Sequence, residues 1–143
     1  RAVRARVFRA NEITSRWVQV HYAEAPRSPQ HNRYVMASTN LMGARLQPYI
    51  HDCVVKIGHR RRQFTFRIFY KRHKFLPVNQ AIQALAGVAI EGDVLIVACG
   101  KKVAVRNMQN RLEARAAEQA VKRFAQGLGP FRTRRSFPAL LEV

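Results

Sequence analysis

The chain has 143 residues, which suits one domain of ordinary size, and nearly half of them are apolar. It carries 26 Lys and Arg against 8 Asp and Glu, a formal net charge of +18, so self-repulsion disfavours a compact fold unless a polyanion neutralises it. The expected partner is nucleic acid, since phosphates bound by Lys and Arg release counterions; an anionic membrane surface is the lesser alternative. The longest apolar run, residues 94–99, is shorter than the roughly 20 residues of a membrane-spanning helix, so no span is expected.

Residues 1–42 show no sustained hydrophobic period and are predicted to be a basic extension that lies on a partner. The first nine residues contain no acid, as is typical of mitochondrial presequences, which suggests a processed organellar precursor. One short strand is expected around Trp17 and Val20. Two prolines and small polar residues between positions 25 and 32 then favour a loop.

Residues 43–106 are predicted to form a small, strongly twisted antiparallel sheet that closes as a barrel. The clearest strand is residues 63–71, where apolar side chains occupy every second position. Further strands are expected at residues 45–57, 94–98 and 102–106. The side chains that share one face of the clearest strand are Phe64, Phe66, Ile68 and Tyr70.

The hydrophobic period becomes helical after the sheet. Residues 107–127 are predicted to form a helix, because apolar side chains recur every four residues and glycine and proline follow. This apolar face is expected to pack on the barrel or on a neighbouring protein, with basic residues on the opposite flank. Residues 128–143 are predicted to be a basic tail, and residues 76–88 to form a short helix or a loop. The apolar positions are Met108, Leu112, Ala116, Ala120 and Phe124, and the basic ones are Arg111, Arg115 and Lys122.

Titratable side chains show no arrangement typical of catalysis. His51, Asp52 and Cys53 are adjacent, but neighbouring side chains of a strand point to opposite faces, so Asp52 is expected to pair with a nearby arginine instead. Cys53 and Cys99 lack a CxxC spacing, and the five histidines lack the spacing of metal ligands. A core of this size needs no disulfide, so a reducing compartment is expected. No catalytic residue, metal, cofactor or small-molecule substrate is predicted.

The segment 56–74 contains eight Lys or Arg and no acid. Its cations gather at both ends of the predicted strand, and Arg67 and Phe69 lie between them on the face away from Phe64. Such a face is typical of nucleic-acid platforms, where phosphate contacts and base stacking coexist. Two alternatives remain: the charges form a solvated face, and Phe69 is covered by the C-terminal helix. The predicted RNA contacts of this segment are His59, Arg60, Arg61, Arg62, Arg67, Phe69, Lys71, Arg72, His73 and Lys74.

Three segments follow one another in the chain: Tyr70-Lys-Arg-His-Lys-Phe, Gln83-Ala-Leu and Ile90-Glu-Gly-Asp-Val-Leu-Ile-Val-Ala. In this order they resemble the second half of the small-subunit ribosomal protein seventeen family. The resemblance implies a five-stranded OB barrel that binds ribosomal RNA. It also implies that Gly92 permits a tight turn and that Asp93 bonds back to the backbone amides of that turn. A basic turn and a last strand would follow, which adds Lys101, Lys102 and Arg106 to the predicted RNA contacts.

These observations predict a mainly β protein, with an OB-like antiparallel barrel, a C-terminal helix and basic terminal arms. Its expected function is that of a structural constituent of a mitochondrial small ribosomal subunit, located in the matrix. The expected partners are ribosomal RNA and, through the terminal extensions, neighbouring ribosomal proteins. The alternatives are a non-ribosomal OB-type protein of organellar RNA processing and a large-subunit ribosomal protein. An enzyme is not expected, because no acid, base or metal constellation is present in the sequence.

Overall fold

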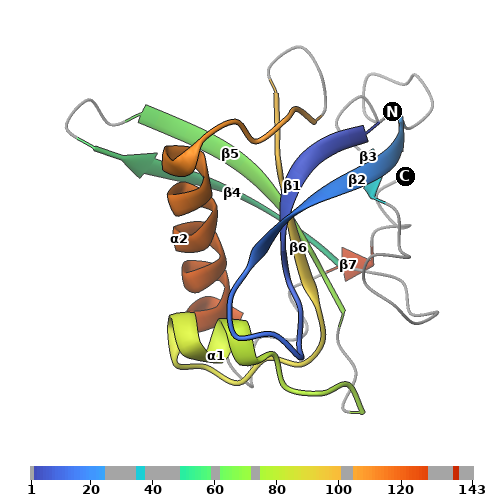
Figure 1. The fold of residues 1–143 in the computed structure, drawn as a ribbon, viewed down its shortest axis with the longest axis vertical. Coiled ribbons are helices and arrows are strands. Elements are labelled where there is room, and N and C mark those ends of the chain that lie inside the picture. The colour runs from blue at the N-terminus through green and yellow to red at the C-terminus, as the bar shows by residue number, and fades with distance from the viewer. Residues whose placement is uncertain are drawn as a thin grey trace.

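The computed structural model describes residues 2–24, 35–37, 49–58, 62–71, 75–100, 105–128 and 137–138. They form strands in one antiparallel sheet and two helices (Figure 1). The strands are β1 (Ala2–Phe8), β2 (Arg16–Glu24), β3 (Val35–Ala37), β4 (Tyr49–Ile57), β5 (Arg62–Tyr70), β6 (Val94–Ala98) and β7 (Phe137–Pro138), and the helices are α1 (Gln80–Ala86) and α2 (Arg111–Leu128).

The strands follow the order β3-β2-β1-β6-β5-β4-β7, and every neighbouring pair is antiparallel. The five longer strands make up most of the sheet, in the spatial order β2, β1, β6, β5 and β4. Within the described residues no pairing joins its two ends, so the sheet is open. A mainly β fold with a C-terminal helix is confirmed, whereas closure into an OB-like barrel is not.

The N-terminal strand β1 lies inside the sheet, between β2 and β6. Val3, Ala5 and Val7 point into the protein and are at most 6% exposed, while the charged Arg4 and Arg6 stand between them in the sequence. The division of the chain that placed residues 1–42 outside the sheet, as a basic extension, is therefore wrong for Ala2–Glu24. The expected short strand around Trp17 is β2, which pairs with β1 over six residues.

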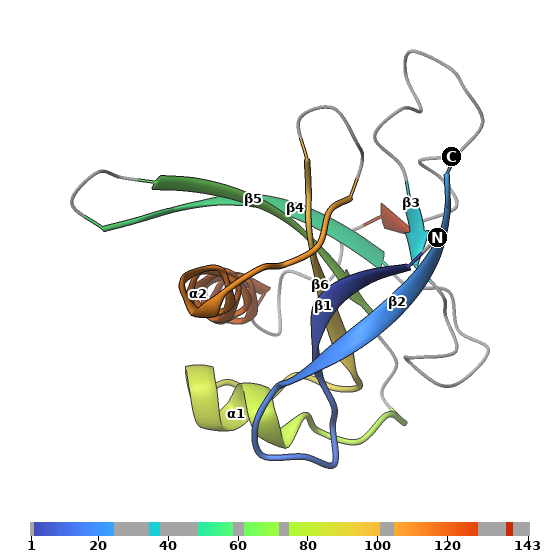
Figure 2. The ribbon, with the colours of Figure 1, turned by 45° about the horizontal axis from the view of Figure 1, so that its top comes forward.

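One face of the sheet forms the larger core, which we call the helix-side core. Its side chains from β5 are the four that the alternation predicted to share a face. Both helices lie on this side of the twisted sheet (Figure 2). Phe124 of α2 meets Tyr70 edge to face, with ring centroids 4.7 Å apart. Packing of the C-terminal helix on the sheet is confirmed, and its residues in this core are Ala116, Ala117, Ala120, Val121, Phe124 and Ala125, with Met108 just before the helix and Leu112 partly buried.

Helix α2 begins four residues later than predicted, because Asn110 caps it. The Asn110 side-chain oxygen accepts a hydrogen bond from the Glu113 amide at 3.0 Å, and the Glu113 carboxylate accepts one from the Gln109 amide at 3.2 Å. This reciprocal arrangement satisfies backbone donors that no helical carbonyl can reach. Residues 76–88 were predicted to form a short helix or a loop, and the structure shows the helix α1 there. Asn79 caps α1, and Gly87 ends it with a φ of 70°.

The opposite face of the sheet carries a second, smaller core of apolar side chains. Leu95 and Val97 of β6 point to this side because they alternate with residues of the helix-side core. The short strand β7, which lies in the predicted basic tail, pairs with β4 at the edge of the sheet. The members of the second core are Val3, Ala5, Val7, Val20, Ile50, Phe69, Leu95, Val97 and Val105, with Val18 beside them.

The turn before β6 differs from the expected one in its hydrogen bonds. Gly92 has a φ of 81°, as a tight turn requires. Asp93, however, does not bond back to that turn in the described residues: its carboxylate accepts a hydrogen bond from the Ala10 amide at 2.7 Å and pairs with Arg9 at 3.3 Å. Asn79 adds a second tie, since its amide donates to the carbonyls of Phe8 and Gly92. Together these contacts fix the end of β1 against the start of β6.

Candidate nucleic-acid interface

The structure describes five of the thirteen predicted RNA contacts, and they do not form one surface. Arg62 is exposed, Arg106 is half-buried, and Arg67, Phe69 and Lys71 are at most 3% exposed. The remaining eight lie outside the described residues: His59, Arg60, Arg61, Arg72, His73, Lys74, Lys101 and Lys102.

Arg67 is a structural cation. It faces Asp52 across β4 and β5, and its Nε and Nη2 donate to the two carboxylate oxygens at 2.8 and 2.9 Å. The expected pairing of Asp52 with an arginine is confirmed. Because both donors are directed at the carboxylate and the side chain is 4% exposed, the prediction that Arg67 contacts RNA is wrong for this structure.

Phe69 and Lys71 are also buried. Phe69 is 1% exposed and packs in the second core, beside Leu95 and Val97. Its ring is therefore not at the surface, where it could stack on a base. It is not covered by the C-terminal helix either, since it lies on the face of the sheet away from α2. Lys71 is 1% exposed, and burial lowers the pKa of its amine while Asp93 opposes that shift. Neither side chain is accessible to a base or a phosphate.

The two other described residues, Arg62 and Arg106, differ in exposure and in their partners. Arg62 is exposed at the start of β5, with its guanidinium 5.6 Å from the centre of the Phe64 ring, and it remains open to a phosphate. Arg106 pairs with Glu113 at 2.7 Å and donates to the Asn107 carbonyl. It therefore anchors the segment that leads into α2.

A basic groove runs along the exposed side of α2. It has a volume of about 570 Å³, and its walls are α2, the end of β4 and Leu85 of α1. Four cations line it against one carboxylate, and none of the four forms an ion pair or side-chain hydrogen bond with another described residue. The cations are Lys56, Arg115, Lys122 and Arg123, and the carboxylate is Glu118.

The geometry of α2 explains this groove. Its buried residues occupy one face, so positions 115, 119 and 122, spaced by four and three, fall together on another. With a rise of about 1.5 Å per residue, Arg115 and Lys122 lie roughly 10 Å apart along the axis. Lys56 reaches the groove from β4, two residues before the turn at Gly58. Sequence reasoning placed Arg115 and Lys122 on a polar flank but did not connect that flank with β4.

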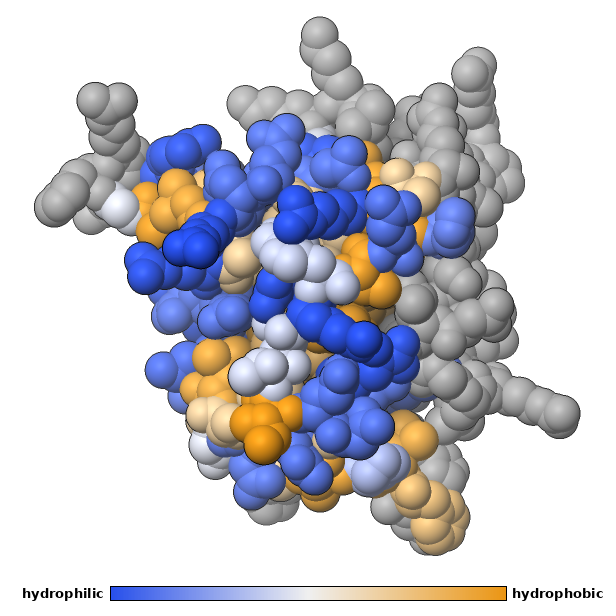
Figure 3. All heavy atoms as spheres, in the orientation of Figure 1, coloured by the Kyte–Doolittle hydropathy of each residue, from blue (hydrophilic) through white to orange (hydrophobic). Residues whose placement is uncertain are grey.

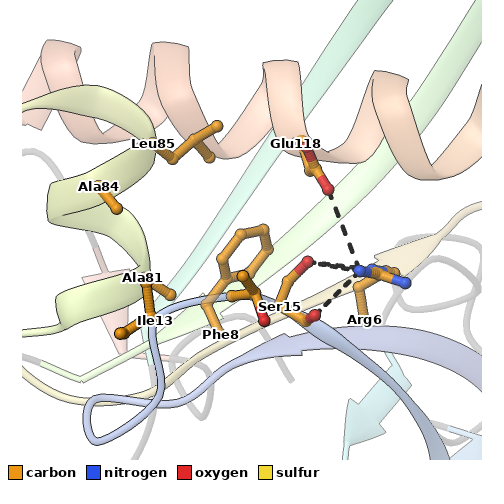
Figure 4. A pocket seen from close by; sticks show the side chains of 9 residues that line it. Arg6, Phe8, Ile13, Ser15, Ala81, Ala84, Leu85 and Glu118 are labelled. Carbon is orange, nitrogen blue, oxygen red and sulfur yellow. Dashed lines mark hydrogen bonds and ion pairs between the residues drawn. The ribbon is translucent and has the colours of Figure 1, made fainter.

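A smaller pocket of about 230 Å³ continues the groove toward β1 and shares Leu85 and Glu118 with it. Figure 4 shows apolar side chains from β1, α1 and the loop before β2 along one wall and Arg6 with Ser15 at the other. Arg6 donates to the Ser15 hydroxyl at 2.6 Å and lies 4.0 Å from Glu118. Arg6 therefore lies between Ser15 and Glu118 in this pocket and contacts both.

Burial shifts the pKa values of one histidine and both cysteines. Partial burial lowers the pKa of His51, whose ring packs 5.1 Å from that of Phe124, while Asp52 opposes the shift. Burial raises the pKa of the Cys53 thiol to about 12 and that of Cys99 to about 11, and both cysteines are free. Among the described residues no three His, Cys, Asp or Glu side chains gather as metal ligands would.

Neither helix in the described part of the chain is both long and apolar enough to cross a membrane. The face seen in Figure 3 is mainly hydrophilic over β1 and β2, with smaller apolar patches between the polar side chains. Comparison with protein-family models, curated proteins and solved structures found no match to this chain. The resemblance of three sequence segments to the ribosomal family therefore stays a prediction.

Proposed function

We propose that the protein binds RNA, with the α2 groove as its principal contact with phosphates. The observation that carries this proposal is the set of four unneutralised cations from two separate elements around a single carboxylate. Such a groove attracts a polyanion and repels a cationic partner. The formal net charge of +18 adds a long-range attraction in the same direction.

The mechanism is electrostatic. Each cation that neutralises a phosphate releases condensed counterions and contributes about 0.7 to 0.9 to the log–log salt slope. Four contacts in the groove would therefore give a slope of roughly 3. Arg62 lies at the neighbouring end of the β4–β5 hairpin, and the sequence adds His59, Arg60 and Arg61 between Gly58 and Arg62.

The proposed setting is a mitochondrial small ribosomal subunit in the matrix, where the protein is a structural constituent that binds ribosomal RNA and neighbouring proteins. The resemblance of residues 70–98 to the ribosomal family supports this setting. The five longer strands equal the number that an OB-like barrel requires, and closure between β2 and β4 would complete one. The second candidate is a non-ribosomal RNA-binding protein of organellar RNA processing, which would use the same basic groove.

Sedimentation tests both the RNA binding and the ribosomal setting of the proposal. A tagged full chain, expressed in its own organism, should sediment with small ribosomal subunits on a sucrose gradient and leave them only at high salt. Association with the large subunit would favour a large-subunit protein, and RNA binding outside ribosomes would favour the second candidate. Failure of the purified chain to bind any RNA at low salt would refute the function itself.

A further inference from the structure

The chain's only tryptophan lies beneath two arginines on the outer part of the sheet. Trp17 of β2 faces Arg6 of β1 across the strand pair, and Arg4 is its diagonal neighbour. The guanidinium carbon of Arg4 is 3.9 Å from the centre of the indole ring, and that of Arg6 is 4.6 Å from it. Both distances are within cation–π range, and we call these three side chains the Trp17 cluster.

The two arginines of the Trp17 cluster are held differently. Arg6 is fixed, because its side chain is 13% exposed and donates to the hydroxyl and the carbonyl of Ser15, as Figure 4 shows. Arg4 is exposed, and its guanidinium forms no hydrogen bond or ion pair with another described residue. Both arginines contact the ring, but Arg6 is held in place by Ser15, whereas Arg4 stays exposed to an outside ligand.

The same face of β2, opposite the second core, continues beyond Trp17. Gln19 and His21 follow Trp17 at every second position and are exposed, whereas Val18 and Val20 turn to the second core. The strip therefore offers a ring, a carboxamide and an imidazole beside the exposed guanidinium of Arg4, with no carboxylate on these positions of β2. This combination suits a ligand that is flat, polar at its edges and attached to an anion.

From this geometry we infer that the Trp17 cluster is a stacking site for an unpaired base of single-stranded RNA. The base stacks on the indole–guanidinium pair, Arg4 contacts the adjoining phosphate, and Gln19 and His21 lie within the strip that meets the base edges. The inference rests on the proposed RNA binding and narrows its substrate, because a duplex keeps its bases paired and cannot offer one. The α2 groove contacts phosphates of either form.

A purely structural cluster is the competing explanation. Cross-strand pairs stabilise sheets, and Arg6 with Trp17 fits that role. Such a role predicts no response of the ring to RNA, so the two explanations differ in a measurable way. Trp17 is the only tryptophan of the chain, and its fluorescence reports on this site alone.

The experiment titrates the full chain with three polyanions: an oligouridylate, the same strand paired with oligoadenylate, and inorganic polyphosphate. Binding is followed independently, by anisotropy of labelled RNA and by competition for polyphosphate. Saturation with the single strand should quench the Trp17 fluorescence, whereas the duplex and polyphosphate should bind without comparable quenching. Binding of the single strand without quenching, or equal quenching by polyphosphate, would overturn the stacking site and leave RNA binding intact. If no RNA binds, the proposed function fails as well.

Variants provide the second measurement. Trp17→Ala should weaken binding of the single strand about 5- to 150-fold and leave duplex binding unchanged. Trp17 is partly buried and packs against the helix-side core. Trp17→Phe keeps a ring there and should therefore lose less. If Trp17→Ala does not fold, as circular dichroism would show, Arg4→Gln serves instead, because Arg4 is exposed. It should lower the preference for single strand over duplex, and an unchanged preference counts against the site.

Discussion

Arg67 keeps a full positive charge almost completely buried within the sheet. Its partner Asp52 is on an outer strand, and that carboxylate is 53% exposed, so water solvates one side of the pair. The bidentate geometry directs two guanidinium donors at the carboxylate and compensates for the loss of hydration. The pair therefore stabilises the β4–β5 hairpin and is not part of the proposed RNA-binding surface.

Replacing Asp52 by Ala should lower the free energy of unfolding by about 1 to 3 kcal/mol, because Arg67 loses two charge-assisted hydrogen bonds. Chemical denaturation measures this change. Arg62→Ala is the matched control on the same hairpin, since Arg62 is exposed and has no carboxylate partner among the described residues. A loss for Asp52→Ala no larger than that of the control would show that the pair is only a surface contact.

The two cysteines predict how stability changes in alkaline solution. Burial favours the neutral thiol, so the folded pKa values of Cys53 and Cys99, about 12 and about 11, exceed those of the unfolded chain. Above about pH 9 the unfolded state therefore binds fewer protons than the folded state, and stability falls as pH rises. Replacing both cysteines by Ala should make the loss of stability between about pH 8 and pH 11 smaller. Parallel pH profiles of the two proteins would contradict the assignment.

Helix α2 has two different faces, and each can be tested separately. Its buried face is fixed by small residues that let the helix approach the sheet and by one large ring, Phe124, which is 4% exposed. Its other face carries the groove. Amphipathic spacing predicted the buried face correctly, because a period of 3.6 residues is a local property of the chain.

Phe124→Ala should lower the free energy of unfolding by about 3 to 5 kcal/mol, since it leaves a cavity and removes the contact with Tyr70. Leu112→Ala should cost less, because Leu112 is only partly buried at the rim of the groove. Thermal or denaturant unfolding measures both. Equal costs for the two variants would mean that the helix packs with a different face toward the sheet.

The groove face should act through charge alone. Changing Arg115, Lys122 and Arg123 together to Gln should flatten the log–log salt slope of RNA binding by about 2 to 3 and weaken binding to unrelated sequences almost equally. The fold should be unaffected, because these side chains lie outside the core. Arg16→Gln, an exposed cation that pairs with Glu12 away from the groove, is the control. An unchanged slope in the triple variant would remove the groove from the interface.

At the scale of the whole molecule, the sequence predicted the elements better than their positions in the fold. The alternation in residues 63–71 identified the helix-side face of β5, and the alternation in β1 went unrecognised because Arg4 and Arg6 stand between its buried residues. Phe69 was assigned to the surface because a strand with one polar face was assumed. In fact β5 is central, and both of its faces are covered.

The candidate site was predictable only in part, for a related reason. Net charge and the basic flank of α2 indicated a polyanion partner, and these are properties of the sequence itself. The groove and the Trp17 cluster instead depend on contacts between segments far apart in the chain: Lys56 with α2, and Trp17 with two arginines of β1. The hydrophobic periodicity of a single segment does not predict contacts between segments that are far apart in the chain.

The position of β1 leads to a prediction about the whole fold. A strand paired on both sides contributes backbone hydrogen bonds to two neighbours, so its amides open only when the sheet itself opens. In the isolated protein, without RNA, the amides of β1 should be protected from hydrogen exchange about as strongly as those of β5 and β6. An N-terminal extension that orders only on a partner would instead exchange at the rate of an unfolded peptide while β5 stays protected. Exchange measured by mass spectrometry on peptides from β1, β5 and the α1 region separates these outcomes, since α1, a short helix at the periphery, provides an internal reference for weaker protection. Fast exchange confined to β1 would overturn the strand order proposed for the sheet's centre, and with it the Trp17 cluster.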